Sequence, residues 1–245
     1  GMTDAWPVVT EPFTQWIVED RFPAGRPDFA AAGAQMVSDV TPFEHMKLRL
    51  LNASHSALAY LGYLAGHETI ASTMTDHRFA AFARQVMQDA APTLTMPQGT
   101  DLAAYSASLL QRFSNAALHH RTWQIAMDGS QKLPQRLLAT MQDRLRLGLS
   151  IDTHALAVAG WMRYVTARDE QGRAIDVRDP LARELAEIAE RAGPSAERLA
   201  PALLEVHSIF GALGSDPRMR NAVTEALARL YALGARQAVQ TFQPA

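Results

Sequence analysis

Three residues whose side chains suit proton-transfer chemistry, as proton carriers or as a hydrogen-bond donor, lie close together near the start of the chain. Lys47, Asn52 and His55 occur in a leucine-rich stretch, 44–65, whose apolar residues have helical spacing. At about 1.5 Å and 100° per residue, His55 lies roughly 12 Å along the helix and 80° around it from Lys47, while Asn52 lies roughly 140° around. One broad helix face therefore carries an amine, an amide and an imidazole.

The chemistry that suits these side chains is proton transfer at a substrate hydroxyl. Burial among leucines lowers the pKa of a lysine, and a lysine with a pKa of about 7–8 can act as a general base. Asn52 can donate its amide N–H to the developing alkoxide, and His55 can hydrogen-bond a neighbouring hydroxyl. The ordinary alternative is a solvated lysine, a capping asparagine and a satisfied core histidine, and spacing alone does not exclude it.

A second segment gathers cations near a turn. His120 and Arg121 precede the turn Asp128-Gly129-Ser130, and Lys132 follows it. These cations can face an anionic ligand, although surface charges near helix ends would give the same pattern. The remaining histidines lack metal-ligand spacing and the chain has no cysteine, so we expect no metal site.

The elements that must position these residues are almost all helical. Apolar periodicity interrupted by Pro and Gly predicts helices at 44–65, 75–91, 101–114, 133–147, 152–164, 181–192, 195–210 and 217–240. A weak pair of strands at 164–166 and 174–177 flanks a Gly-containing turn and predicts a small β-hairpin. The sequence therefore predicts an all-α, single multi-helix domain with one small hairpin.

The first 30 residues differ from the rest. They contain Pro7, Pro12, Pro23 and Pro27 together with the aromatic residues Trp6, Phe13, Trp16 and Phe22, which predicts an extended N-terminal arm with one helical stretch at 12–19. We therefore divide the chain into an arm or interdomain segment, 1–30, and a helical catalytic (substrate) domain, 31–245. An aromatic arm without a partner would be an exposed apolar patch, so we expect it to pack against another domain or against the helices.

Bulk composition excludes several classes of function. The chain has 245 residues, 48% of them hydrophobic and 20% charged, which excludes a disordered chain. A net charge of −2 gives no electrostatic reason to expect nucleic acid or an anionic membrane as a partner. No apolar run approaches the ~20 residues of a membrane span, and no signal-peptide pattern is present, so we expect a cytoplasmic protein.

Two nucleotide-binding signatures are missing. The sequence contains neither Gly-x-Gly-x-x-Gly nor a Gly-x-x-x-x-Gly-Lys-Ser/Thr phosphate loop, and apolar strands do not alternate with helices. We therefore expect this chain to bind no dinucleotide by a fold of its own.

The motif Lys, four residues, Asn, two residues, His resembles the one in the C-terminal helical domain of the long-chain mannitol dehydrogenase family, and Lys47, Asn52 and His55 match it one for one. The resemblance covers essentially the whole chain. It includes the arm, from Pro12-Phe13 to Gly25-Arg26-Pro27, the segment Leu58 to Gly62 and the pair Asp179-Pro180.

This resemblance implies an NAD- or NADP-dependent dehydrogenase that uses no metal. A Rossmann domain, absent from this chain, would precede it as its partner and bind the cofactor. Lys47 would be the general acid/base, and Asn52 would form the oxyanion site together with an asparagine of the absent domain. His55 would contact substrate hydroxyls, and Lys132 matches a substrate-contacting lysine.

One departure concerns the substrate, a small sugar acid or polyol. Gln124 and Met127 stand where mannitol 2-dehydrogenases have Arg and His, and the runs 121–132 and 158–165 resemble fructuronate reductases, also called D-mannonate oxidoreductases. We therefore favour a hexuronate, with His120, Arg121 and Lys132 as candidate partners of its carboxylate. The alternatives are polyol oxidation of the mannitol 2-dehydrogenase type and a stand-alone helical binding module without catalysis.

Overall fold

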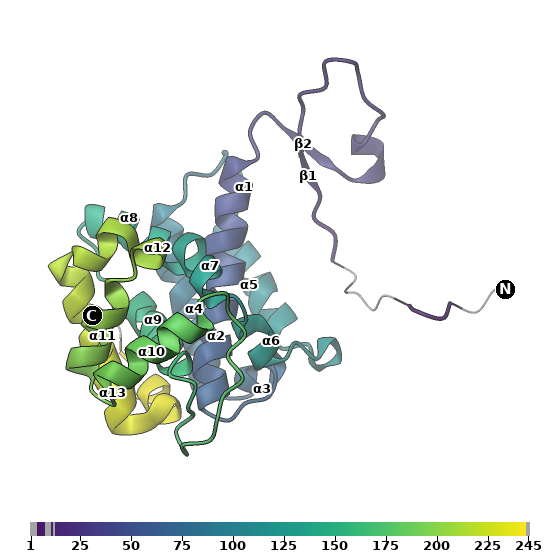
Figure 1. The fold of residues 1–245 in the computed structure, drawn as a ribbon. Coiled ribbons are helices and arrows are strands. Elements are labelled where there is room, and N and C mark those ends of the chain that lie inside the picture. Colours follow the sequence, from purple (N-terminus) through teal and green to yellow (C-terminus); the bar gives the residue numbers. More distant parts are fainter. Residues whose placement is uncertain (1–3, 8–10, 12, 244–245) are drawn as a thin grey trace.

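The structure is a computed structural model that describes residues 4–7, 11 and 13–243. Its described part consists of a helical body from which the N-terminal segment projects (Figure 1). The body comprises α1 (Thr41–Met46), the π-helical turn η2 (Lys47–Asn52), α2 (Ala53–Leu64), α3 (Ile70–Met74), α4 (His77–Ala90), η3 (Ala91–Thr93), α5 (Leu102–Phe113), η4 (Ala116–Leu118), α6 (Thr122–Ala126), α7 (Gly129–Leu133), the π-helical turn η5 (Pro134–Leu138), α8 (Ala139–Arg146), α9 (Asp152–Tyr164), α10 (Ala182–Ala192), α11 (Ala196–Leu204), α12 (His207–Phe210), η6 (Gly211–Ser215) and α13 (Pro217–Gln240). The predicted all-α class is confirmed.

Local sequence explains where several helices begin. The side chains of Asp76, Asp101 and Asp216 accept hydrogen bonds from the first-turn N–H groups of α4, α5 and α13, which otherwise have no intrahelical partner. Gly234 lies inside the last predicted helix and adopts a φ of +74°, so α13 is kinked there. Such a φ suits glycine because it has no Cβ.

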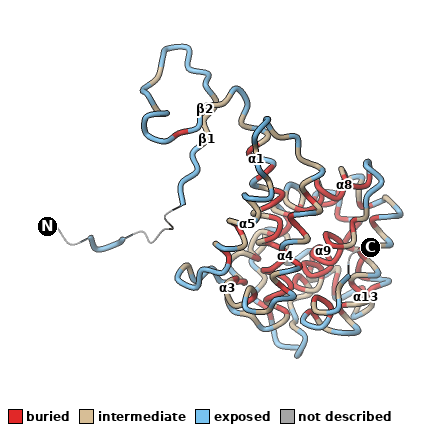
Figure 2. The backbone as a smooth tube through the Cα atoms, turned by 180° about the vertical axis from the view of Figure 1, so that it is seen from behind, coloured by how far each residue is buried: buried red, intermediate tan, exposed pale blue. Residues whose placement is uncertain are grey.

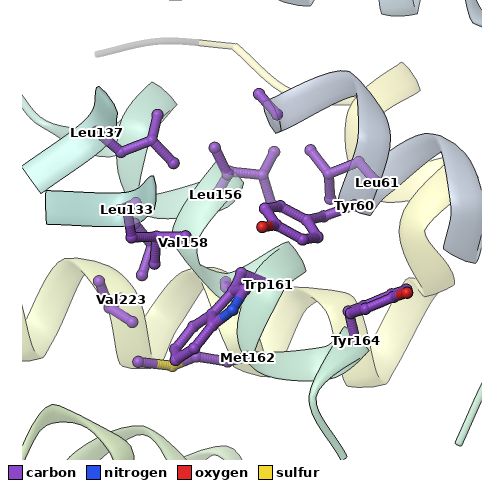
Figure 3. Packing of buried hydrophobic residues seen from close by; sticks show 14 of the residues in the cluster. Tyr60, Leu61, Leu133, Leu137, Leu156, Val158, Trp161, Met162, Tyr164 and Val223 are labelled. Atoms are coloured by element: carbon purple, nitrogen blue, oxygen red, sulfur yellow. The ribbon is translucent and has the colours of Figure 1, made fainter. Parts of the chain in front are cut away.

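Helices α2 and α9 form the centre of the body. Both are rich in Ala, Leu and Gly on all sides, and nearly all of their residues are buried, as expected for helices without a polar face. Trp161 and Tyr164 of α9 pack with Tyr60 and Leu61 of α2 in this core (Figure 3). Gly160 allows the close approach, because a Cβ there would lie 2.8 Å from the Leu61 side chain. Helix α13 packs along α9 and α2 and completes the core.

The N-terminal segment is extended and carries a short parallel sheet. Strand β1 (Ile17–Glu19) pairs with β2 (Gln35–Val37), and the chain between them passes through η1 (Ala30–Ala32). Trp16 and Phe22 pack on Phe29, with ring centroids 5.4 and 5.8 Å away. This small unit projects from the helical body, which it contacts through Ile17 and Val37, and most of it is exposed (Figure 2).

The structure differs from the predicted N-terminal segment in two details. The predicted helical stretch at 12–19 is wrong for the described residues 13–19, which are irregular and then form β1. The pairing of β1 with β2 joins residues that are distant in the sequence, and local periodicity carries no information about such a contact. The extended unit reaches Val37, beyond residue 30, and helical structure of the body begins at α1. The division into 1–30 and 31–245 stays a prediction.

The antiparallel turn near residue 170 is shorter than the strands predicted around it. One bridge, Arg168 with Ala174, forms in place of strands 164–166 and 174–177, because α9 continues to Tyr164. The Asp169 carboxylate closes the turn by accepting hydrogen bonds from the backbone N–H groups of Gln171 and Arg173, at 2.9 and 2.8 Å. Side-chain capping therefore stabilises this turn in place of a β-ladder.

Candidate active site

The segment that carries Lys47 and Asn52 is a π-helical turn between two α-helices. The N–H of Ala53 bonds to the carbonyl of Leu48, five residues back. Each residue of a π turn rotates less about the axis than in an α-helix, so Asn52 is offset from the direction of Lys47 by less than the ~140° of a regular helix. The Ser54 hydroxyl donates to the carbonyls of Leu50 and Leu51, which the widened turn leaves available. The π turn thus aligns the amine and the amide better than the predicted regular helix.

Lys47 lies in an open cleft. Its side chain is exposed, so the predicted burial among leucines is wrong for this chain: Leu50 is fully buried on the opposite side, while Lys47 faces outward. The cleft has a volume of about 380 Å³ and is bounded by the arm, α1, η2 and α5. Its lining residues are Phe13, Gln15, Ile17, Val40, Phe43, Glu44, Lys47, Leu51, Tyr105 and Arg112.

His55 lies one turn further along in α2 and is shielded from solvent. Its ring stacks on Phe113 at 4.9 Å and lies 5.5 Å from the ring of His120. Burial and, after it, the positive charges of His120, Arg136, Arg112 and Lys132 together lower the pKa of His55 to about 3. The imidazole is therefore neutral near pH 7. Its buried Nε2 has no hydrogen-bond partner among the described residues.

Arg112 and Tyr105 of α5 are site residues that the sequence did not reveal. The Arg112 guanidinium donates to both oxygens of Glu11, at 2.9–3.1 Å, and covers the ring of Phe13 at 4.0 Å. The hydrogen bond from Arg112 lowers the pKa of the Glu11 carboxyl. These contacts attach the arm to the helices beside Lys47. Such long-range pairs leave no local signal in the sequence.

The turn at 128–130 is held against the core. Asp128 adopts a left-handed conformation, with a φ of +54°, and Gly129 sits against Trp161 and Tyr60 with no room for a Cβ. The Asp179 carboxylate accepts hydrogen bonds from the backbone N–H of Ser130 at 2.7 Å and from its hydroxyl at 2.6 Å. Asp179 thereby caps α7, which carries Lys132.

The three predicted carboxylate partners lie in different surroundings. Lys132 donates to the carbonyl of Met127 at 2.6 Å and lies 3.8 Å from the Asp128 carboxylate, and burial followed by the charge of Arg136 lowers its pKa. His120 is exposed beside His55. Arg121 is exposed, and its backbone forms a bridge with Thr69. The structure therefore brings His120 close to His55, whereas the ammonium group of Lys132 already has contacts within the chain.

Arg136 is a further cation that the sequence analysis missed. It lies in η5, half-buried, and its Nη1 donates to the buried hydroxyl of Ser56 at 3.0 Å. Its positive charge contributes to the lowered pKa of His55, and η5 packs against α2, so Arg136 lies near the predicted substrate site.

The described residues contain no group of three or more His, Asp or Glu side chains placed to hold a metal ion. Within the same ranges, no helix is both long enough and apolar enough to cross a bilayer.

Comparisons with known proteins identify a family and several relatives. Residues 39–231 match the family described as the mannitol dehydrogenase C-terminal domain. D-mannonate oxidoreductase from Escherichia coli strain K12 is 55% identical over 98% of this chain and 49% of its own length. Mannitol 2-dehydrogenase from Phaeosphaeria nodorum is 38% identical over 99% of this chain and 42% of its own. The solved structure of Pseudomonas fluorescens mannitol 2-dehydrogenase, a ternary complex with NAD and D-mannitol, superimposes with a TM-score of 0.89 at 37% identity, covering 97% of this chain and 48% of the other. The chain thus spans about half the length of these relatives.

Proposed function

The chain belongs to the mannitol dehydrogenase family and corresponds to its C-terminal domain, and on this premise we propose that it is the substrate domain of an NAD(P)-dependent oxidoreductase that interconverts D-mannonate and fructuronate. The observation that carries the proposal is the 55% identity to D-mannonate oxidoreductase over nearly the whole chain. The mannitol 2-dehydrogenases compared above reach 37–38%. The substitutions at Gln124 and Met127 favour the same substrate.

The proposed chemistry follows from the positions of the three motif residues. Lys47 takes the proton from the substrate hydroxyl during oxidation and returns it during reduction, and its exposed position in the cleft gives a substrate access. Asn52, which the π turn brings nearer to the direction of Lys47, donates its amide N–H to the oxygen that develops negative charge. The neutral His55 hydrogen-bonds a neighbouring hydroxyl and fixes the orientation of the carbon chain.

The described residues do not fit a dinucleotide. The sheet they form has two short strands, and no glycine-rich strand-to-helix turn follows either of them. We assign the cofactor to the part of the relatives that this chain does not span, and to no residue of this chain. When bound there, the nicotinamide takes up or gives the hydride.

A second candidate is polyol oxidation of the mannitol 2-dehydrogenase type. The TM-score of 0.89 to such an enzyme favours it, because the helical scaffolds are nearly the same. Scaffold similarity does not choose the substrate, since specificity depends on a few side chains in the cleft.

The test is a comparison of kcat/KM for fructuronate, tagaturonate and fructose with the full-length enzyme under one set of conditions. We expect fructuronate to exceed fructose by about 30- to 150-fold, because a site built for a carboxylate leaves its cation unpaired when the substrate is neutral. Equal values, or a preference for fructose, would overturn the assignment and favour the polyol reaction.

A further inference from the structure

The half-buried guanidinium of Arg136 is the feature that the proposed chemistry leaves unexplained. Resting on the proposed function, we infer that Arg136 forms a carboxylate-binding subsite beside His55 and holds the end of the hexuronate farthest from the reacting carbon.

The first observation is that Arg136 lacks an acidic partner among the described residues. Three other covered arginines show the usual arrangement with a carboxylate: Arg49 contacts Asp143 at 2.6 Å, Arg112 contacts Glu11 at 2.9 Å and Arg144 contacts Asp89 at 3.6 Å. Arg136 has only the neutral hydroxyl of Ser56, and its buried Nε has no hydrogen-bond partner in the described part of the chain. A covered charge without a counterion is costly, so a protein retains one where a ligand supplies the opposite charge.

The second observation is the position of this charge within the site. Arg136 lowers the pKa of both His55 and Lys132, so its field reaches the two residues predicted to contact substrate. Turn η5, which carries Arg136, packs against both η2 and α2, the elements that carry Lys47 and His55. Arg136 therefore belongs to the same wall of the site as the motif residues.

The third observation is that the other cations are less suitable partners. Lys132 already donates to the Met127 carbonyl and faces Asp128, while Arg112 is neutralised by Glu11. Arg121 is exposed, where an ion pair contributes little. Among these three arginines, Arg136 is the one that is partly buried and has no carboxylate partner in the described part of the chain, and a guanidinium can bind a carboxylate through parallel hydrogen bonds.

The geometry of a hexuronate fits this arrangement. The ketone of fructuronate is adjacent to the terminal hydroxymethyl group, and the carboxylate is at the opposite end of the carbon chain. Lys47 and His55 are separated by roughly 12 Å along the helix axis, a distance that long side chains shorten. The reacting carbon can thus lie near Lys47 while the carboxylate lies beyond His55, next to Arg136.

The experiment compares Arg136→Gln and Arg136→Lys with the wild-type full-length enzyme. The substrates are D-mannonate and its neutral amide, D-mannonamide, which keeps every hydroxyl. We expect Arg136→Gln to lower kcat/KM for mannonate about 10- to 100-fold and for mannonamide less than threefold, and Arg136→Lys to retain part of the mannonate activity. The loss should be mainly in KM, because the carboxylate is remote from the reacting carbon and is bound equally in ground and transition states. Arg183→Gln, at an exposed arginine paired with Glu187 on α10, is the matched control and should leave both values unchanged.

The outcomes separate this inference from the proposed function. Wild-type enzyme without activity on mannonate would refute the function itself. Active wild type whose Arg136→Gln variant loses mannonate and mannonamide activity in equal proportion would refute the carboxylate subsite, because a purely structural role affects both substrates. The ratio is measured within one protein, so a partly unfolded variant still gives an answer.

Discussion

Asp179 offers a direct test of how this fold holds its site. We predict that Asp179→Ala destabilises the chain and releases the turn at 128–130 that leads to Lys132. The Asp179 carboxylate accepts hydrogen bonds from the backbone N–H and the hydroxyl of Ser130, and from the N–H of Leu181. Ser130 is 5% exposed, so these donors lie away from solvent.

The magnitude follows from the donors that lose their partner. A buried donor left unsatisfied costs about 1–3 kcal/mol, and Ser130 would lose the partner of two such donors. Water can fill the space left by the half-buried Asp179 side chain and hydrogen-bond these donors, so the total cost should lie toward the lower end of the summed range. We therefore expect the free energy of unfolding to fall by about 2–4 kcal/mol.

The assay is urea unfolding of the chain followed by circular dichroism. Asp176→Ala is the matched control: it lies three residues earlier in the same loop, its side chain is 76% exposed, and it pairs only with Arg178. We expect the control to change stability by less than about 0.5 kcal/mol. If the two variants unfold at the same urea concentration, Asp179 does not hold the turn and the reasoning is refuted.

Four further predictions use the same structure. In the full-length enzyme, Lys47→Ala should lower the rate of single-turnover hydride transfer about 10²–10⁴-fold with unchanged cofactor affinity, and a rate near wild type would remove Lys47 from the mechanism. Burial lowers the pKa of His154 from 6.5 to about 4. As the pH drops from about 6.5 to about 4, this histidine therefore becomes protonated in the unfolded chain but not in the folded one, and the free energy of unfolding should fall. Urea unfolding at several pH values should show that His154→Leu reduces this slope by up to about 1.4 kcal/mol per pH unit, and an unchanged slope would contradict the assignment. Gly129→Ala should lower the free energy of unfolding by about 1–3 kcal/mol, because the added Cβ collides with Trp161 and Tyr60, and a neutral result in thermal unfolding would disprove that crowding. Calorimetry with this chain alone should detect no saturable NADH binding, and an affinity in the micromolar range would show that it holds a nucleotide site.

Most helices could be predicted from the sequence because the signals that define them, apolar stretches and capping residues, are local. The stretch 152–164 is mostly apolar and becomes the buried α9, and Asp76 and Asp101 mark the starts of α4 and α5. Helix α6 was missed because it has only five residues and lies between His119 and Asp128, two non-glycine residues with positive φ. Short helices bounded by unusual backbone conformations carry little periodicity.

The site was predictable in its chemistry and less so in its geometry. Lys47, Asn52 and His55 share a local motif, but the π turn depends on a shifted hydrogen-bond ladder that no residue spacing displays. Arg112 and Arg136 reach the site from other helices, so no pattern near the motif points to them. The assumption that leucine neighbours bury Lys47 failed because successive helical residues point in different directions.

The two ends of the proposed substrate site differ in how firmly this chain holds them. At one end, the His55 ring stacks on Phe113, and the segment bearing Lys132 is held in place because Gly129 packs directly against Trp161. At the other end, Lys47 is exposed, and part of its cleft is formed by the projecting arm. A rigid end can select the substrate because its groups need no reorganisation on binding, whereas proton transfer by Lys47 gains from a covered site with less water. We therefore expect substrate selection to reside largely in this helical body, and catalysis to require the nucleotide-binding half to close over Lys47.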